Sequence, residues 1–162
     1  MTATTRPATW EDLLRVARYL EQAGVKYALI GGYALAVHGL NRLSEDLDLL
    51  VDPAQENTER WIAALSQLPD GAARELATET DVFQREGPYA IRINDEFTVD
   101  VMPSACGHSW DELSAYIEKK EIDGVAIPVL SMDGLLLTKE GMRDRDRADA
   151  AALRRAIEVK KR

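Results

Sequence analysis

Two aspartates lie within one apolar run of the sequence, and this pairing restricts the folds that can accommodate it. Asp46 and Asp48 are two residues apart, and the residues from Leu47 to Val51 are otherwise apolar. Because the side chains of a β-strand alternate between faces, a strand over residues 46–52 places both carboxylates on the same face. Two unpaired buried carboxylates are costly, so the pair requires a cation or strong hydrogen-bond donors. A hard divalent cation such as Mg²⁺ prefers carboxylate oxygen, and the pair is therefore predicted to bind metal.

The same spacing recurs at Asp144 and Asp146, so the spacing alone does not identify a metal site. In this second pair the chain passes from a polar segment into a predicted helix, where residues two apart do not face each other. Acidic residues are also favourable near a helix N-terminus because of the helix dipole. We therefore expect Asp144 and Asp146 to form a solvated helix start.

The composition restricts the class of protein. With 162 residues and one cysteine, the chain can form a domain with a hydrophobic core and has no internal disulfide framework. It contains no long apolar stretch for a membrane span and no secretion leader, so we expect a cytoplasmic protein with no membrane partner. Two histidines and one cysteine, Cys106, are too few for a usual structural zinc site.

The charge of the chain is unevenly distributed. The formal net charge of −8 argues against broad nucleic-acid binding. However, residues 139–162 contain nine basic and five acidic residues, whereas the remainder contains eleven basic and twenty-three acidic residues. The C-terminal segment is typical of a solvated amphipathic helix. The alternative is that part of this basic segment faces a phosphate-bearing ligand.

The hydrophobic pattern predicts an α/β fold that follows a loose leader at residues 1–8. Helices are expected from the Thr9 cap to Gly24, at 33–38, at 54–68, from the Ser109 cap to Ile117, at 132–142 and at 145–160. Strands are expected at 26–30, 46–52, 82–85, 89–94, 97–102 and 125–130, the last at a sheet edge because it contains Pro128. We expect one domain over residues 1–162, with a metal-binding core at 9–105 and a mainly helical part at 106–162.

A glycine pair and a third aspartate complete the pattern around Asp46 and Asp48. Gly31 and Gly32 stand between a predicted strand and a predicted helix, where glycines let backbone amides approach a phosphate closely. The absence of G-x-G-x-x-G and of Gly-Lys-Ser/Thr excludes a dinucleotide fingerprint and a Walker A loop. Asp100 lies in an otherwise apolar predicted strand and is expected to be a third metal ligand.

Together these residues resemble the minimal nucleotidyltransferases of the DNA polymerase β superfamily. The matching sequence is Gly31-Gly32-Tyr33-Ala34, His38-Gly39, Arg42, Ser44 and Asp46-Leu47-Asp48, followed by Asp100. A weaker match covers residues 130–153, with Leu135, Lys139, Arg143, Asp146 and Asp149. The likeness is greatest to bacterial stand-alone members, which include abortive-infection-type toxins and aminoglycoside or lincosamide nucleotidyltransferases. It implies a mixed β-sheet core flanked by helices, with further helices at the C-terminus.

The resemblance also implies a reaction and the residues that perform it. Asp46, Asp48 and Asp100 would be the catalytic residues and would hold two Mg²⁺ ions, for which Mn²⁺ could substitute in vitro. The nucleotide-binding residues would be Gly31, Gly32, Tyr33, Arg42, Ser44 and Lys139. The implied enzyme moves a nucleoside monophosphate from an NTP such as ATP to an acceptor hydroxyl and releases pyrophosphate.

Two positions depart from the family pattern. Many members have serine as the second residue of the glycine turn, where its hydroxyl helps to hold phosphate, and Gly32 cannot do this. Tyr33, Ser44 or Arg42 would then compensate, or the affinity for phosphate would be lower. Ser44 itself stands where close relatives often have threonine. We expect His38, on a short predicted helix, to have a structural role rather than a catalytic one.

The sequence leaves the acceptor open. A toxin of a toxin–antitoxin system would modify tRNA and have an antitoxin partner, but an RNA acceptor requires a basic surface, which only residues 139–162 offer. An antibiotic-modifying enzyme would suit the acidic remainder of the chain, because a cationic drug is drawn to negative potential. A protein acceptor is a third route. Outside the enzymes, the alternative is a non-catalytic module of the same fold that binds a nucleotide or a partner protein.

Overall fold

The computed structural model describes residues 5–42, 44–79, 82–85, 90–140 and 144–161. Its centre is a six-stranded sheet with the order β3-β4-β2-β1-β8-β7. These strands are β1 (Tyr27–Ile30), β2 (Leu47–Val51), β3 (Ile91–Asn94), β4 (Thr98–Met102), β7 (Ile117–Ile122) and β8 (Val125–Leu130). Strand β2 is parallel to β4 and antiparallel to β1, and β1 is parallel to β8. The sheet is therefore mixed, as predicted.

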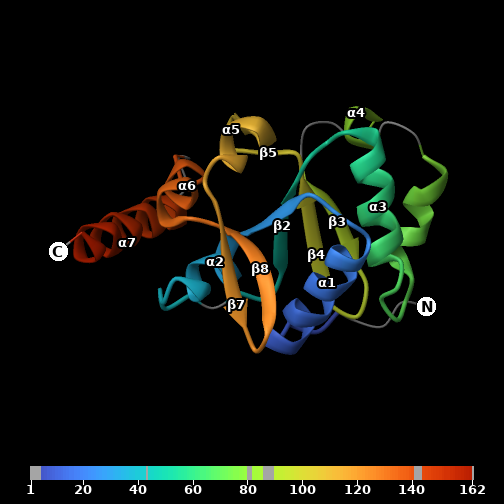
Figure 1. Cartoon of the computed structure of the whole chain (residues 1–162), viewed down its shortest axis with the longest axis horizontal. Helices are drawn as coiled ribbons and strands as arrows, with labels where there is room; N and C mark the ends of the chain where they lie inside the picture. The colour runs from blue at the N-terminus through green and yellow to red at the C-terminus, as the bar shows by residue number, and fades with distance from the viewer. Residues whose placement is uncertain (1–4, 43, 80–81, 86–89, 141–143, 162) are drawn as a thin grey trace.

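Helices flank this sheet, and a small hairpin lies beside it (Figure 1). The helices are α1 (Trp10–Gln22), α2 (Gly31–Val37), α3 (Gln55–Leu65), the 3₁₀ helix η1 (Ala72–Thr78), α4 (Val82–Arg85), α5 (Trp110–Ser114), α6 (Met132–Leu137) and α7 (Asp144–Lys160). The hairpin is formed by β5 (Ser104–Ala105) and β6 (His108–Ser109). Helices α1 and α3 pack against each other, while α7 packs on α6 and then extends away from the sheet. Among the described residues, no helix has the length and apolar character that crossing a bilayer requires.

The hydrophobic core lies between the sheet and the helices. Trp61 of α3, Leu13 and Leu20 of α1, and Leu49 of β2 are all completely or almost completely buried. Each large apolar side chain buried in this way contributes roughly 1.5 to 3 kcal/mol to stability. Strand β2 is thereby held rigidly at the centre of the sheet. We propose that the chain is one domain, because this sheet includes strands from both sides of residue 105.

The predicted helix after Thr9 is confirmed, with its caps. The Thr9 side chain accepts a hydrogen bond from the Asp12 amide, and the Asp12 carboxylate accepts one from the Thr9 amide. This reciprocal arrangement is a capping box. The helix ends at Gln22, and Gly24 follows with a φ of +71° that favours glycine.

Two strand predictions were wrong. Residues 82–85 form the single helical turn α4, because two apolar residues followed by two polar ones do not distinguish a strand from one turn of a helix. Strand β8 is not at an edge, since it lies between β1 and β7. Pro128 is tolerated there because the register between β8 and β1 is limited to Leu29 opposite Val129.

The edge strand next to β8 is β7, which the sequence analysis missed. The helix capped by Ser109 ends at Ser114, so Ile117 begins β7 instead of ending a helix. Four consecutive charged residues, Glu118 to Glu121, occupy the middle of β7, and the exposure of its side chains alternates along the strand. The missed signal was Asp123-Gly124, where both φ angles are positive, as a two-residue hairpin turn requires.

Candidate active site

Three aspartates from adjacent strands lie at one end of the sheet. Asp48 of β2 and Asp100 of β4 are direct partners in the parallel register, and Asp46 immediately precedes β2. Asp100 is buried and Asp48 is partly buried. The structure therefore brings together the three carboxylates that the sequence predicted to share a site.

The proximity of these carboxylates changes their protonation. Burial, together with the negative charges of Asp100 and Asp46, raises the pKa of Asp48 to about 7, even though the charge of Lys139 acts in the opposite direction. Burial and the charge of Asp100 also raise the pKa of Asp46, which the charge of Arg92 partly offsets. This end of the sheet thus has an excess of negative charge that a cation would relieve.

Arg92 of β3 supplies part of that positive charge, and the sequence analysis did not single it out. It lies directly opposite Asp100 in the antiparallel register between β3 and β4. Its Nε and Nη2 atoms donate to the two carboxylate oxygens of Asp100 at 3.0 and 3.1 Å, and Nη2 lies 3.4 Å from Asp46 Oδ2. Pairing the predicted strands across their Asn94-Asp95 turn would have revealed this contact.

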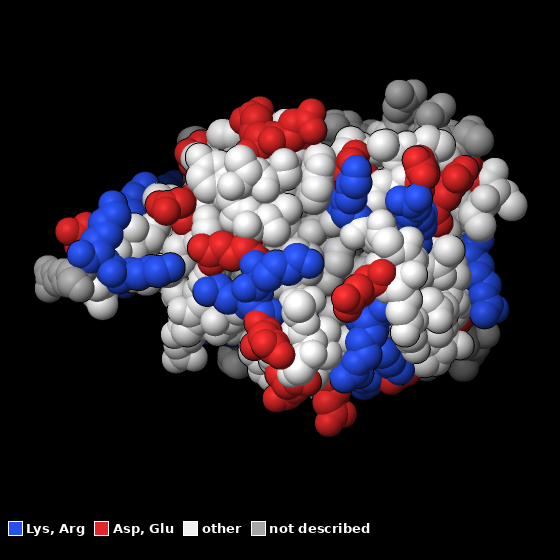
Figure 2. Space-filling view, viewed as in Figure 1, with Lys and Arg blue, Asp and Glu red and all other residues white. Residues whose placement is uncertain are grey.

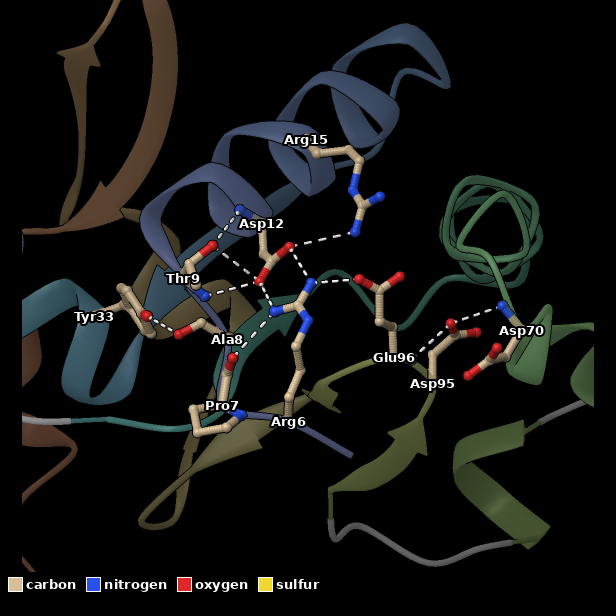
Figure 3. A network of polar contacts seen from close by, with 10 residues as sticks. All are labelled: Arg6, Pro7, Ala8, Thr9, Asp12, Arg15, Tyr33, Asp70, Asp95 and Glu96. Atoms are coloured by element: carbon tan, nitrogen blue, oxygen red, sulfur yellow. Dashed lines mark hydrogen bonds and ion pairs between the residues drawn. The ribbon is translucent and has the colours of Figure 1, made fainter. Parts of the chain in front are cut away.

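The turn between β3 and β4 fixes the position of Arg92. Asp95 is buried and accepts hydrogen bonds from the amides of Asp70 at 2.9 Å, Ala72 at 3.0 Å and Glu96 at 2.8 Å. Three amide donors stabilise a buried carboxylate without a neighbouring cation. The close-up view shows the bond from Asp70 (Figure 3). The hairpin that carries Arg92 and Asp100 is thereby attached to Asp70 and to the first residue of η1.

The glycine pair packs directly against Asp48 and Ser44. Gly31 has a φ of +74°, and a Cβ atom there would lie 2.0 Å from Asp48 Oδ2. A Cβ atom on Gly32 would lie 2.5 Å from the Cβ of Ser44. A side chain at either position would therefore collide with Asp48 or Ser44. This is a second reason for glycine there, besides the expected close approach of a phosphate to the backbone.

A cleft of about 1080 Å³ opens over these residues. Of the residues predicted from sequence, it is lined by Gly31, Gly32, Arg42, Ser44, Asp46, Asp48, Asp100 and Lys139. Tyr33 is apart from this cleft and lines a smaller cavity of about 130 Å³, which shares Gly32, Arg42 and Ser44 with it. In the described part of the chain, no three His, Cys, Asp or Glu side chains are arranged as a ready-made metal site.

The C-terminal helix α7 holds Lys139 at the cleft. Lys139 Nζ lies 3.1 Å from Asp149 Oδ2 and 3.8 Å from Asp146 Oδ1, and both aspartates are buried. Arg42 Nη2 lies 3.8 Å from the same Asp149 oxygen. The prediction of a solvated start to this helix was therefore wrong for Asp146, although Asp144 is exposed. Arg143, part of the weaker sequence match, lies outside the described residues.

The first described residues are firmly attached, contrary to the expected loose leader. Arg6 donates to Asp12 and Glu96 (Figure 3). Its guanidinium also lies 5.5 Å from the centre of the Phe97 ring. The Ala8 amide donates to the Glu45 carbonyl at 2.8 Å, and so holds the segment that carries Asp46. We call Arg6 to Thr9 the N-terminal strap, because it connects α1, the β3–β4 turn and the segment that carries Asp46.

Two further predictions concern residues outside the cleft. The Nε2 atom of His38 donates to the Leu130 carbonyl at 2.8 Å and links α2 to β8, which agrees with the expected structural role. The basic C-terminal segment is solvated at its distal part, where Arg154, Arg155, Lys160 and Lys161 are exposed. Figure 2 shows basic side chains on the protruding end of the molecule, where α7 lies.

Comparisons with known proteins indicate the family and the fold of the chain. A family model described as aminoglycoside-2''-adenylyltransferase matches residues 12–153. Among solved structures, the fold is similar to that of the lincosamide antibiotic adenylyltransferase LnuA with lincomycin bound, with a TM-score of 0.58 and 16% identity over 91% of this chain and 98% of that chain. A candidate nucleotidyltransferase from Thermotoga maritima gives a TM-score of 0.53 and 16% identity over 96% of this chain and 94% of that chain. No curated protein sequence matches the chain.

Proposed function

The chain belongs to the aminoglycoside-2''-adenylyltransferase family and is a nucleotidyltransferase, and from this premise we propose its reaction. It moves AMP from ATP to a hydroxyl group of a cationic small molecule of the aminoglycoside class, and it releases pyrophosphate. The observation that carries this proposal is the direct pairing of Asp48 with Asp100, beside Asp46, in a cleft large enough for two ligands.

Nucleotidyltransferases of this kind generally use divalent metal ions, and the residues at the cleft fit such an ion. Three carboxylates form the donor set that Mg²⁺ prefers. The raised pKa of Asp48 and the contacts of Arg92 with Asp46 and Asp100 are further support, because both indicate a place where positive charge is favourable. Asp46, Asp48 and Asp100 would hold the metal. When bound, the metal would stabilise negative charge on the reacting phosphate oxygens.

The side chains and backbone of the cleft would perform the remaining steps. Asp100 would accept the proton of the acceptor hydroxyl, whose oxygen then forms a bond to the α-phosphorus of ATP. The bond between the α-phosphorus and the bridging oxygen breaks, and pyrophosphate leaves with that electron pair. Lys139 and Arg42 would hold the phosphates, and the amides of the Gly31-Gly32 turn would approach them closely.

The acidic character of the chain supports a cationic acceptor. The net charge of −8 attracts a polycationic ligand, and Glu45 adds a further carboxylate to the cleft lining beyond the three aspartates. A tRNA acceptor, with an antitoxin as partner, is the second candidate because of one observation. Helix α7 presents Arg154, Arg155, Lys160 and Lys161 to solvent and also contributes Arg145 to the cleft lining.

Pyrophosphate release distinguishes these acceptors. Each of the four nucleoside triphosphates would be incubated with Mg²⁺ and with a panel of aminoglycosides, a lincosamide, pooled tRNA or no acceptor. We expect release from ATP only with an aminoglycoside, and no release by Asp48→Asn. Release that requires tRNA would replace the antibiotic acceptor with RNA. Absence of nucleotide binding and of release under every condition would contradict the proposed function.

A further inference from the structure

Arg92 occupies the carboxylate oxygens that a metal would need. Its Nε and Nη2 atoms contact both oxygens of Asp100, and Nη2 also contacts Asp46. A two-point contact between guanidinium and carboxylate is a strong charge-assisted interaction. A metal at Asp100 requires at least one of the same two oxygens. Metal binding must therefore break at least one of the contacts that Arg92 makes with Asp100.

The surroundings of Arg92 allow the pairing to be exchanged. Strand β3 is an edge strand, and the Arg92 side chain is 59% exposed although it lines the cleft. A released guanidinium can therefore rotate within the cleft without disturbing the core. A nucleoside triphosphate that enters with the metal offers phosphate oxygens, which match the guanidinium as well as a carboxylate does.

We infer that Arg92 is an internal counterion, which holds Asp46 and Asp100 in the substrate-free enzyme and moves to the triphosphate when metal and nucleotide bind together. This inference rests on the proposed function, because it assumes that these aspartates hold metal. Metal alone must displace Arg92 and leave it without a partner, whereas metal with nucleotide supplies a new partner. Arg92 therefore makes the binding of metal and the binding of nucleotide favour each other.

Titration with Mn²⁺, followed by electron paramagnetic resonance, tests this inference without any turnover. The wild-type protein, Arg92→Gln and Arg145→Gln would be titrated with and without a non-hydrolysable ATP analogue. Arg145 lines the same cleft from α7, so its variant removes one positive charge but leaves the contacts of Arg92 in place. Arg92→Lys, which keeps the charge but not the two-point contact, provides a second variant should Arg92→Gln fold poorly.

We expect Arg92→Gln to bind Mn²⁺ alone about tenfold more tightly than wild type, or about 1.4 kcal/mol, since its carboxylates are free. The analogue should increase Mn²⁺ affinity strongly in wild type and Arg145→Gln, weakly in Arg92→Gln, and to an intermediate extent in Arg92→Lys. Equal Mn²⁺ affinity of wild type and Arg92→Gln would overturn the inference, while analogue-dependent Mn²⁺ binding would leave the proposed function standing. Absence of Mn²⁺ binding in every protein, with and without the analogue, would overturn both.

Discussion

Asp48 and Asp100 are directly opposite each other on the parallel strands β2 and β4, at the end of the sheet where the cleft opens. Paired residues on neighbouring parallel strands point to the same face of the sheet. Neither Asp48 nor Asp100 can therefore turn its carboxylate to the opposite face and away from the other. The apolar core beneath β2 fixes the strand. The repulsion between the two carboxylates is therefore built into the fold.

The first prediction follows from that repulsion and concerns stability without metal. The pKa of Asp48 is raised from 3.8 to about 7, so folding disfavours its ionised form. The resulting loss of folding free energy is absent below about pH 4, grows as the pH rises from about 4 to about 7, and is complete above about pH 7. In EDTA, Asp48→Asn should therefore unfold in urea with roughly 2 to 4 kcal/mol more stability than wild type at pH 8, and with little difference at pH 4. A loss of stability at pH 8 would contradict this account.

The second prediction concerns turnover. Asp100→Asn removes a proposed metal ligand and proton acceptor while keeping the shape of the side chain. We expect pyrophosphate release to fall on the order of a thousandfold, or about 4 kcal/mol in activation free energy, with an unchanged circular dichroism spectrum. Asp111→Asn is the matched control, because Asp111 is an exposed aspartate of α5 and should retain full activity. A fully active Asp100→Asn would exclude Asp100 from the reaction.

The local sequence was sufficient to predict the centre of this site. The alternation around Asp46 and Asp48 requires only that the apolar residues next to them in the strand be buried, and Leu47 and Leu49 are buried. Gly31 was expected because a turn follows a strand there, and its positive φ agrees. These features depend on neighbours in sequence, which is why the pattern reveals them.

The contacts that connect distant segments could not be predicted in the same way. Asp146 was expected in solvent because its own helix gives no sign that Lys139 lies 3.8 Å away. Strand β7 was missed because an exposed edge strand carries few apolar residues, and its charges resemble those of a helix. Arg92 acquires its role only through the register with Asp100, which depends on how two strands pair.

The third prediction tests why glycine occupies position 31. Gly31→Ala forces a Cβ atom to within 2.0 Å of Asp48 Oδ2, so Asp48 must move. We expect loss of turnover and of Mn²⁺ binding together with a lower melting temperature. Gly39→Ala is the control, since Gly39 also has a positive φ of +87° but nothing lies within 4 Å of its Cβ position. That variant should cost only about 1 kcal/mol for its backbone and stay active. Equal effects of the two variants would refute the crowding argument.

The fourth prediction concerns acid stability of the N-terminal strap. Burial raises the pKa of Asp12, but hydrogen bonds from Arg6 and Thr9 outweigh it and place the pKa below its usual 3.8. A lowered pKa contributes stability that is present above about pH 4 and is lost as the pH falls through the folded value. Asp12→Asn should therefore melt at a lower temperature than wild type at pH 7, and the difference should shrink below pH 4. A difference that stays constant with pH would show that shape, not charge, is responsible.

The fifth prediction concerns the attachment of α7 to the cleft. The Lys139 side chain is 13% exposed, and its Nζ lies 3.1 Å from Asp149, with Asp146 also within 4 Å. Lys139→Met removes this cation from two buried carboxylates, and removing one member of a buried pair costs about 3 to 5 kcal/mol. Because Arg42 still lies 3.8 Å from Asp149, we expect a cost at or below the lower end of that range. Lys119→Met, on the exposed face of β7, removes an equal charge and should cost little.

A double-mutant cycle separates this charge pairing from the packing of the lysine. Asp149→Asn removes the charge that Lys139 neutralises, so Lys139→Met should be less damaging in its presence, by roughly 1 to 3 kcal/mol of coupling free energy in urea denaturation. Additive effects would mean that Lys139 stabilises α7 through its aliphatic chain alone. Because the charge of Lys139 also lowers the pKa of Asp48, Lys139→Met should weaken nucleotide-dependent pyrophosphate release even when α7 remains folded. Retention of full activity in a folded Lys139→Met protein would place this lysine outside the phosphate site.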